Sequence, residues 1–172
     1  MNRTFANMAN FKMFFNEHFN PLCNYLHLYI KDRETCKEIA QDTFVKIWES
    51  REQIKINTSL KSYLYQAGRN KAIDYIRRSK KEQEIKDELG AVPQFVQPPE
   101  LESNTVRIRE LILEAMESLK PKCKEIFWLH KFEGLTQREI ADHLGISKRA
   151  VEDNIARALL ILKETLKDKV SI

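Results

Sequence analysis

Glycine and proline are scarce in this chain of 172 residues, which contains four glycines and five prolines. This is about half of the roughly 12% that the two residue types make up in an average protein. Because a fold of many short strands needs many turn residues, their scarcity favours long helices. Long apolar runs are also missing: the longest has five residues, 158–162, against the roughly 20 that a membrane-spanning helix needs. We therefore predict an all-α protein without a membrane span.

Cysteine and clustered carboxylates are rare as well. The three cysteines (Cys23, Cys36 and Cys123) lie far apart in the sequence and lack metal-ligand spacing. The first ten residues hold one basic residue and no apolar block, which predicts no signal peptide. The acidic residues do not cluster as a metal-dependent nuclease requires. We therefore expect a reduced, cytoplasmic protein that is not an enzyme and needs no cofactor or metal.

The charge is distributed unevenly, although the net charge is only +4. Residues 61–81 contain seven basic side chains and one acidic one, whereas residues 82–106 contain six acidic side chains and one lysine. The acidic stretch also holds three of the five prolines, and this composition is typical of a linker. The sequence therefore predicts two small helical domains, 1–81 and 105–172, joined by a flexible linker over 82–104.

Apolar residues recur at spacings of three and four in both predicted domains, as in amphipathic helices. Pro21 interrupts the first such stripe and is expected to begin a second helix, because proline suits the first helical position. Asp32 is a candidate N-cap for the next helix, and another helix is expected to begin near Ser59. The aromatic side chains of the first stripe are expected to form the core of the first domain.

Residues 135–155 (LTQREIADHLGISKRAVEDNI) carry the most specific pattern in the chain. Thr136 and Glu139 form a T-x-x-E capping box, which predicts the start of a helix. Gly145 supplies the left-handed residue that ends it, and Ser147 is expected to cap the next helix. Two short helices joined by a glycine turn form a helix-turn-helix, which we predict over 136–158.

In such a motif the exposed N-terminal half of the second helix enters the major groove of DNA. With Val151, Ile155 and Leu159 facing inward, Arg149 is placed to pair with guanine and Glu152 with the amino group of cytosine. Phosphate contacts are expected from basic neighbours. The full predicted set is Lys148, Arg149, Glu152, Asp153 and Arg157. The alternative is a helical hairpin whose charges are merely solvated.

Three segments together resemble the sigma factors of RNA polymerase in the extracytoplasmic-function (ECF) group. Residues 37–48 (KEIAQDTFVKIW) are similar to their second conserved region, and residues 60–78 (LKSYLYQAGRNKAIDYIRR) resemble the helix that recognises the minus-10 promoter element. Residues 119–162 resemble their fourth region, which recognises the minus-35 element. The similarity covers nearly the whole chain, and the order of the segments also matches.

The resemblance implies a role for each segment. The first would dock on the clamp coiled coil of the largest polymerase subunit, with Gln41, Asp42, Lys46 and Trp48 as the candidate contacts; the alternative is that Asp42 and Lys46 pair with each other. The second would hold the opened minus-10 DNA. Its candidate residues are Tyr65, Arg69, Asn70, Lys71, Tyr75, Arg77 and Arg78. Either tyrosine is equally suited to stack on an unpaired base or to lie in the core.

We therefore expect an alternative sigma factor that binds core RNA polymerase and directs promoter-specific transcription initiation. Family habit also implies an anti-sigma factor as a partner. The competing hypothesis is a stand-alone helix-turn-helix repressor or activator, which would bind a palindromic duplex without polymerase.

Overall fold

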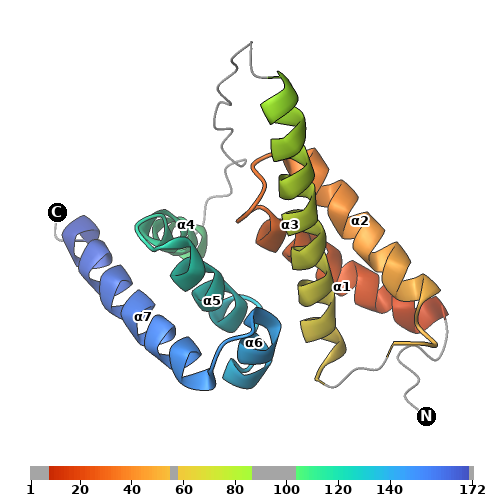
Figure 1. The fold of residues 1–172 in the computed structure, drawn as a ribbon. Helices are drawn as coiled ribbons and strands as arrows, with labels where there is room; N and C mark the ends of the chain where they lie inside the picture. The colour runs from red at the N-terminus through yellow and green to blue at the C-terminus, as the bar shows by residue number, and fades with distance from the viewer. Residues whose placement is uncertain (1–7, 55–57, 87–103, 171–172) are drawn as a thin grey trace. The chain divides into compact units, whose positions relative to one another are not determined.

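The computed structural model describes residues 8–54, 58–86 and 104–170, and the side chains of 8–54, 58–80 and 110–167. These residues form seven α-helices, and no strand is present among them, which confirms the predicted all-α fold (Figure 1). The chain divides into two compact units, unit 1 (Met1–Asp87) and unit 2 (Glu88–Ile172). Most of the predicted linker, 87–103, lies outside the described residues.

Unit 1 contains α1 (Met8–Leu26), α2 (Arg33–Glu49) and α3 (Leu60–Lys86). α3 thus continues five residues past 81, where the first domain was expected to end. The core forms around Phe44 of α2, which is 1% exposed. Four phenylalanine rings of α1 surround it, with centroids 4.9–6.3 Å away: Phe11, Phe14, Phe15 and Phe19. This arrangement confirms that the aromatic stripe builds the core.

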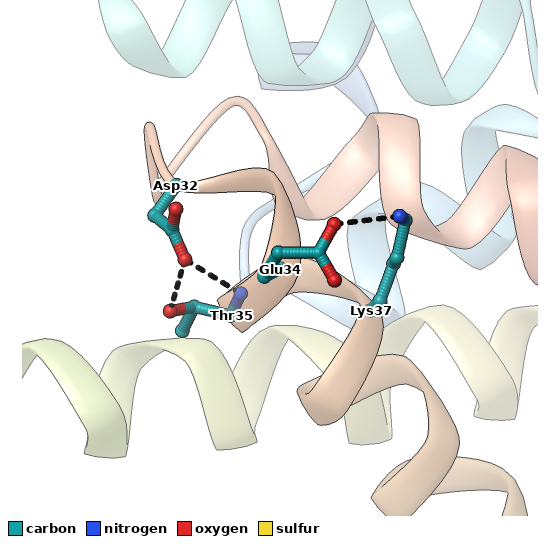
Figure 2. Close-up of polar contacts among 4 residues, drawn as sticks. All are labelled: Asp32, Glu34, Thr35 and Lys37. Carbon is teal, nitrogen blue, oxygen red and sulfur yellow. Dashed lines mark hydrogen bonds and ion pairs between the residues drawn. The ribbon is translucent and has the colours of Figure 1, made fainter.

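The α2 helix begins where its N-cap was predicted. The Asp32 carboxylate accepts hydrogen bonds from the backbone N–H of Thr35 at 2.7 Å and from its hydroxyl at 2.6 Å (Figure 2). These two donors hold the pKa of Asp32 below its usual range. In the same turn, Lys37 Nζ lies 2.7 Å from Glu34 Oε1. The α3 helix has a similar start, because Ser59 Oγ accepts from the N–H of Ser62 at 3.1 Å.

Pro21 does not begin a new helix, contrary to expectation, but lies inside the continuous helix α1. An internal proline removes one backbone hydrogen bond and costs about 3 kcal/mol. The following turn buries Leu22, Tyr25 and Leu26 completely, and each such side chain contributes about 1.5–3 kcal/mol. Burial of this face therefore outweighs the local penalty, and the helix continues through the proline.

Unit 2 contains α4 (Asn104–Met116), α5 (Pro121–Lys131), α6 (Gln137–Leu144) and α7 (Lys148–Val170). Its core draws fully buried side chains from α5, α6 and α7, among them Ile126, Leu129, Ile140, Val151 and Ala158. The α7 helix packs against each of the other three helices of this unit. It is therefore both the central support of the unit and the second helix of the predicted helix-turn-helix.

The inward face of α7 differs from the predicted one at Leu159, which is 47% exposed. The buried positions are instead Val151, Ile155, Ala158 and Leu162. In an α-helix each residue turns by about 100°, so residue 159 lies about 80° away from residue 151 and residue 158 only about 20° away. A step of three after Ile155, rather than another step of four, therefore keeps the stripe on the core.

Candidate nucleic-acid interface

The helix-turn-helix made by α6, the glycine turn and α7 has the geometry that the sequence predicted. Thr136 Oγ1 accepts from the N–H of Glu139 at 3.2 Å, and Glu139 Oε2 accepts from the N–H of Thr136 at 2.9 Å. Gly145 is left-handed, with φ 64° and ψ 38°, and Ser147 Oγ accepts from the N–H of Ala150 at 3.1 Å. The starts of α6 and α7 are thus each fixed by their own hydrogen bonds, and the predicted capping box and caps are confirmed.

The N-terminal half of α7 presents a polar surface opposite the buried Val151 and Ile155. The five predicted contact residues are all exposed there: Lys148, Arg149, Glu152, Asp153 and Arg157. Lys148 Nζ lies 3.4 Å from Glu152 Oε1, an exposed pair of a kind that contributes only about 0.3–0.5 kcal/mol. Such a pair is weak enough to open when a base or phosphate replaces either partner.

The basic side chains of α3 differ in exposure and in their partners. Asn70, Arg77 and Arg78 are exposed, and Arg69 and Lys71 are half-buried. Arg77 Nη1 lies 3.4 Å from Asp74 Oδ1. Lys71 Nζ lies 3.8 Å from Asp42 Oδ2 of α2, so the ion pair of Asp42 joins two helices instead of following α2 to Lys46.

The two tyrosines predicted as stacking platforms do not share a surface. Tyr75 is 42% exposed, whereas Tyr65 has no exposed surface. The Tyr65 ring packs against that of Tyr25, with centroids 5.2 Å apart. A base cannot stack on a ring that is completely buried, so the core alternative holds for Tyr65 and its stacking role is withdrawn.

The predicted polymerase contacts lie along α2. Gln41, Asp42 and Lys46 are exposed, and Trp48 is half-buried. The Trp48 ring lies 4.8 Å from that of Phe11, and the guanidinium carbon of Arg51 sits 4.1 Å from the Trp48 centroid. The indole is thus held in place by a core ring and by a cation, with part of its surface still accessible.

Sequence patterns did not indicate the side chains outside α3 that hold its basic residues. Tyr29 accepts a hydrogen bond at 3.1 Å from Nε of Arg69, which lies 40 positions further along the chain. The pairing of Asp42 with Lys71 likewise joins α2 to α3. Periodicity and capping patterns act over a few residues, so no local signal indicated either contact.

The thiols are placed as packing groups. The Cys36 thiol donates to the carbonyl of Ile30 at 3.3 Å, and that of Cys123 donates to the carbonyl of Asn154 at 3.3 Å. Burial raises the pKa of Cys36 to about 11, and it also raises the pKa values of Cys23 and Cys123. Across the side chains that the structure places, three or more His, Cys, Asp or Glu residues do not gather as a metal site would require. Among the helices described, none is long and apolar enough to cross a membrane.

Known proteins share both units. Residues 14–82 match the family Sigma-70 region 2, and residues 109–162 match Sigma-70, region 4. RNA polymerase sigma factor YlaC of Bacillus subtilis (strain 168) is 31% identical over 155 residues, which are 88% of this chain and 89% of YlaC. The ECF RNA polymerase sigma factor SigM of the same organism is 29% identical over 146 residues, 84% of this chain and 87% of SigM.

A solved structure has the same fold. It is the sigma factor RpoE in complex with the anti-sigma factor NepR from Bartonella quintana, with a TM-score of 0.73 and 19% sequence identity. The match covers 93% of this chain and 98% of the RpoE chain.

The helix-turn-helix of the second unit, together with the matches to Sigma-70 regions 2 and 4, places the chain in the class of DNA-binding transcription factors. More specifically, the chain belongs to the sigma-70-like RNA polymerase sigma factors of the ECF group. It is an alternative sigma factor, which binds core RNA polymerase and directs transcription initiation at specific promoters; a stand-alone regulator is not favoured.

Proposed function

We propose that the exposed half of α7 recognises the minus-35 element. The observation that carries this proposal is the placement of Arg149 on the first turn of α7, directly after the capped turn. In this position a guanidinium can reach the O6 and N7 atoms of guanine as a bidentate donor. Glu152 would accept from a cytosine amino group beside it, and Lys148 and Arg157 would contact the phosphates. The exposed Asp153 carboxylate would accept from a donor on a base edge.

The α3 helix is proposed to hold the opened minus-10 region. Arg77 and Arg78 are exposed near the end of its described side chains, where they would follow the phosphate backbone. Arg69, held by Tyr29 of the turn after α1, and Lys71, held by Asp42 of α2, would contact phosphates. Asn70 would hydrogen-bond a base edge. Tyr75 is sufficiently exposed to stack on an unpaired base.

The α2 helix is proposed to dock on the clamp coiled coil of the largest polymerase subunit. Gln41, Asp42 and Lys46 supply polar contacts on its exposed side, and the accessible part of Trp48 supplies an apolar one. Aromatic anchors surrounded by polar groups are typical of the energetically important part of an interface.

The proposed domains are 1–81 for polymerase docking and minus-10 recognition, 82–104 as the linker, and 105–172 for minus-35 recognition. Two weak DNA-binding modules gain affinity together when the linker lets both reach their elements at once. The solved RpoE of Bartonella quintana was determined with an anti-sigma factor, and we infer that this chain has an inhibitor of the same kind. It would act in the cytoplasm without catalytic activity of its own.

The test is transcription by core polymerase reconstituted with this chain, using templates that differ in single minus-35 base pairs. Arg149→Ala is expected to weaken promoter binding by about 1–3 kcal/mol and to relax discrimination at one position. Lys163→Ala, an exposed basic position on the same helix, serves as the matched control and should change binding less than twofold.

Two results would contradict these assignments. An equal loss for Arg149→Ala on every minus-35 variant would show that Arg149 makes no base-specific contact. A Lys163→Ala effect as large as that of Arg149→Ala would show that only the overall positive charge of α7 matters.

A further inference from the structure

Three tyrosines, Tyr65 of α3, Tyr25 of α1 and Tyr29 of the turn after α1, form a chain of contacts that ends at the half-buried Arg69 side chain. Arg69 Nε donates to the hydroxyl of Tyr29 at 3.1 Å, and the hydroxyls of Tyr29 and Tyr25 lie 3.3 Å apart. The rings of Tyr25 and Tyr29 are perpendicular, with centroids 5.7 Å apart, and the Tyr25 ring packs on Tyr65. Tyr25 and Tyr65 have no exposed surface. The hydroxyl that holds Arg69 is therefore supported by the core.

The Tyr29 hydroxyl at Arg69 differs chemically from the carboxylates that contact Lys71 and Arg77. Lys71 faces the Asp42 carboxylate and Arg77 faces that of Asp74, so that each would have to be drawn from an opposite charge to bind a phosphate. A tyrosine hydroxyl accepts a hydrogen bond from an N–H group without carrying a negative charge. The contact with Tyr29 thus orients the guanidinium of Arg69 without itself adding an opposite charge.

An arginine side chain that is already ordered before binding has a higher affinity for a phosphate than a mobile one. A free arginine loses rotamer entropy when it is immobilised, and part of this loss is avoided if the side chain is already ordered. The guanidinium has five N–H donors in one plane, so a bond at Nε orients that plane and uses one of the five.

We propose that Tyr29 is a positioning residue for Arg69, and that Tyr25 in turn orients the Tyr29 hydroxyl. The two tyrosines hold the guanidinium ready for a phosphate of the opened minus-10 strand. This inference rests on the proposed role of α3 in binding that strand.

The test compares Tyr29→Phe, Arg69→Ala and the double variant as holoenzymes with core polymerase, by measuring the equilibrium constant for promoter opening at several salt concentrations. Tyr29→Phe keeps the ring and removes one hydroxyl, and a hydrogen bond of this kind predicts a loss of about three- to tenfold. Tyr63→Phe, which removes a hydroxyl from the same unit, is the matched control and should behave like the unmodified protein. Urea unfolding of each variant checks that unit 1 remains folded.

Two further readouts separate positioning from simple support of the fold. Tyr29→Phe should cause no additional loss when Arg69 is already alanine, because the hydroxyl then has no guanidinium to hold. It should also shift the salt dependence toward that of Arg69→Ala, whose slope falls by about 0.7 for one lost phosphate contact on a single strand. A structural defect alone would leave this slope unchanged.

The outcomes distinguish this inference from the proposed function. If Arg69→Ala impairs opening and Tyr29→Phe does not, or if their losses add in the double variant, the positioning role is refuted while the DNA contact stands. If Arg69→Ala has no effect on opening, the assignment of Arg69 to the minus-10 strand fails, and the positioning role fails with it.

Discussion

Replacing Leu162 with alanine is expected to lower the free energy of unfolding of unit 2 by about 2–5 kcal/mol. Leu162 is 5% exposed and completes the buried stripe that α7 presents to its own unit. Alanine at this position removes the buried leucine surface and leaves a cavity, which together account for the loss. At roughly 0.05–0.15 kcal/mol per residue, a unit of this size has a net stability of only several kcal/mol, so the change is a large fraction of the total.

The two tryptophans allow the units to be followed separately. Trp128 is buried in unit 2, where its Nε1 donates to Glu133 Oε1 at 3.0 Å, and Trp48 belongs to unit 1. In a Trp48→Phe background the fluorescence therefore reports the urea unfolding of unit 2. With a slope of about 1–2 kcal/mol per molar urea, even a loss of 2 kcal/mol moves the midpoint by about 1–2 M.

Leu159→Ala is the matched control, because it makes the same substitution three positions earlier on the same helix, where the side chain is 47% exposed. Exposed substitutions of this kind usually change stability by about 0.5 kcal/mol or less. Equal losses at the two leucines, or a greater loss at Leu159, would refute the packing face described for α7.

Three further predictions concern single side chains. Thr136→Ala removes the N-cap of α6 and should lower the free energy of unfolding of unit 2 by about 1 kcal/mol, as measured by urea unfolding. Thr136→Ser keeps a capping hydroxyl and should retain most of this stability. Equal stability of the Ala and Ser variants would contradict the capping role. The lowered pKa of Asp32 means that its stabilisation is complete above about pH 4 and is lost as the pH falls through the lowered pKa. As the pH falls from about 4 to 2, the free energy of unfolding of Asp32→Asn should therefore decrease less than that of the unmodified protein. If the free energies of unfolding of the two proteins fall in parallel over this pH range, the N-cap effect is contradicted. Burial raises the pKa of Cys36 from 9.0 to about 11, so its thiolate fraction at pH 8 is about a hundredfold lower than that of an ordinary cysteine. Iodoacetamide should therefore modify Cys36 at least a hundredfold more slowly in the folded protein than in urea, as measured by mass spectrometry. Comparable rates in the two conditions would show that the thiol is accessible.

Sequence patterns predicted the local features of this protein well. The caps at Asp32, Thr136 and Ser147, the left-handed Gly145 and the helix start near Ser59 are confirmed, because each depends on groups within three or four residues of one another. The resemblance to ECF sigma factors was likewise confirmed by the matches in both units.

Several features that depend on contacts between particular side chains of different elements were not predicted. The continuity of α1 through Pro21 depends on how much surface the next turn buries, and a helical stripe does not show this quantity. Tyr65 could not be assigned from its spacing, since its burial depends on Tyr25 of another helix. The bond between Tyr29 and Arg69 joins positions 40 apart, and only the folded chain brings these together.

The shielding of the native thiols has a practical consequence for spectroscopy. All three have raised pKa values, so maleimide dyes should prefer a cysteine introduced at an exposed site. One such site in each unit, for example Glu38 on α2 and Lys163 on α7, would give a fluorescent pair without prior removal of the natural cysteines. Energy transfer between the dyes would then follow the separation of the two units as the chain assembles with polymerase and engages a promoter.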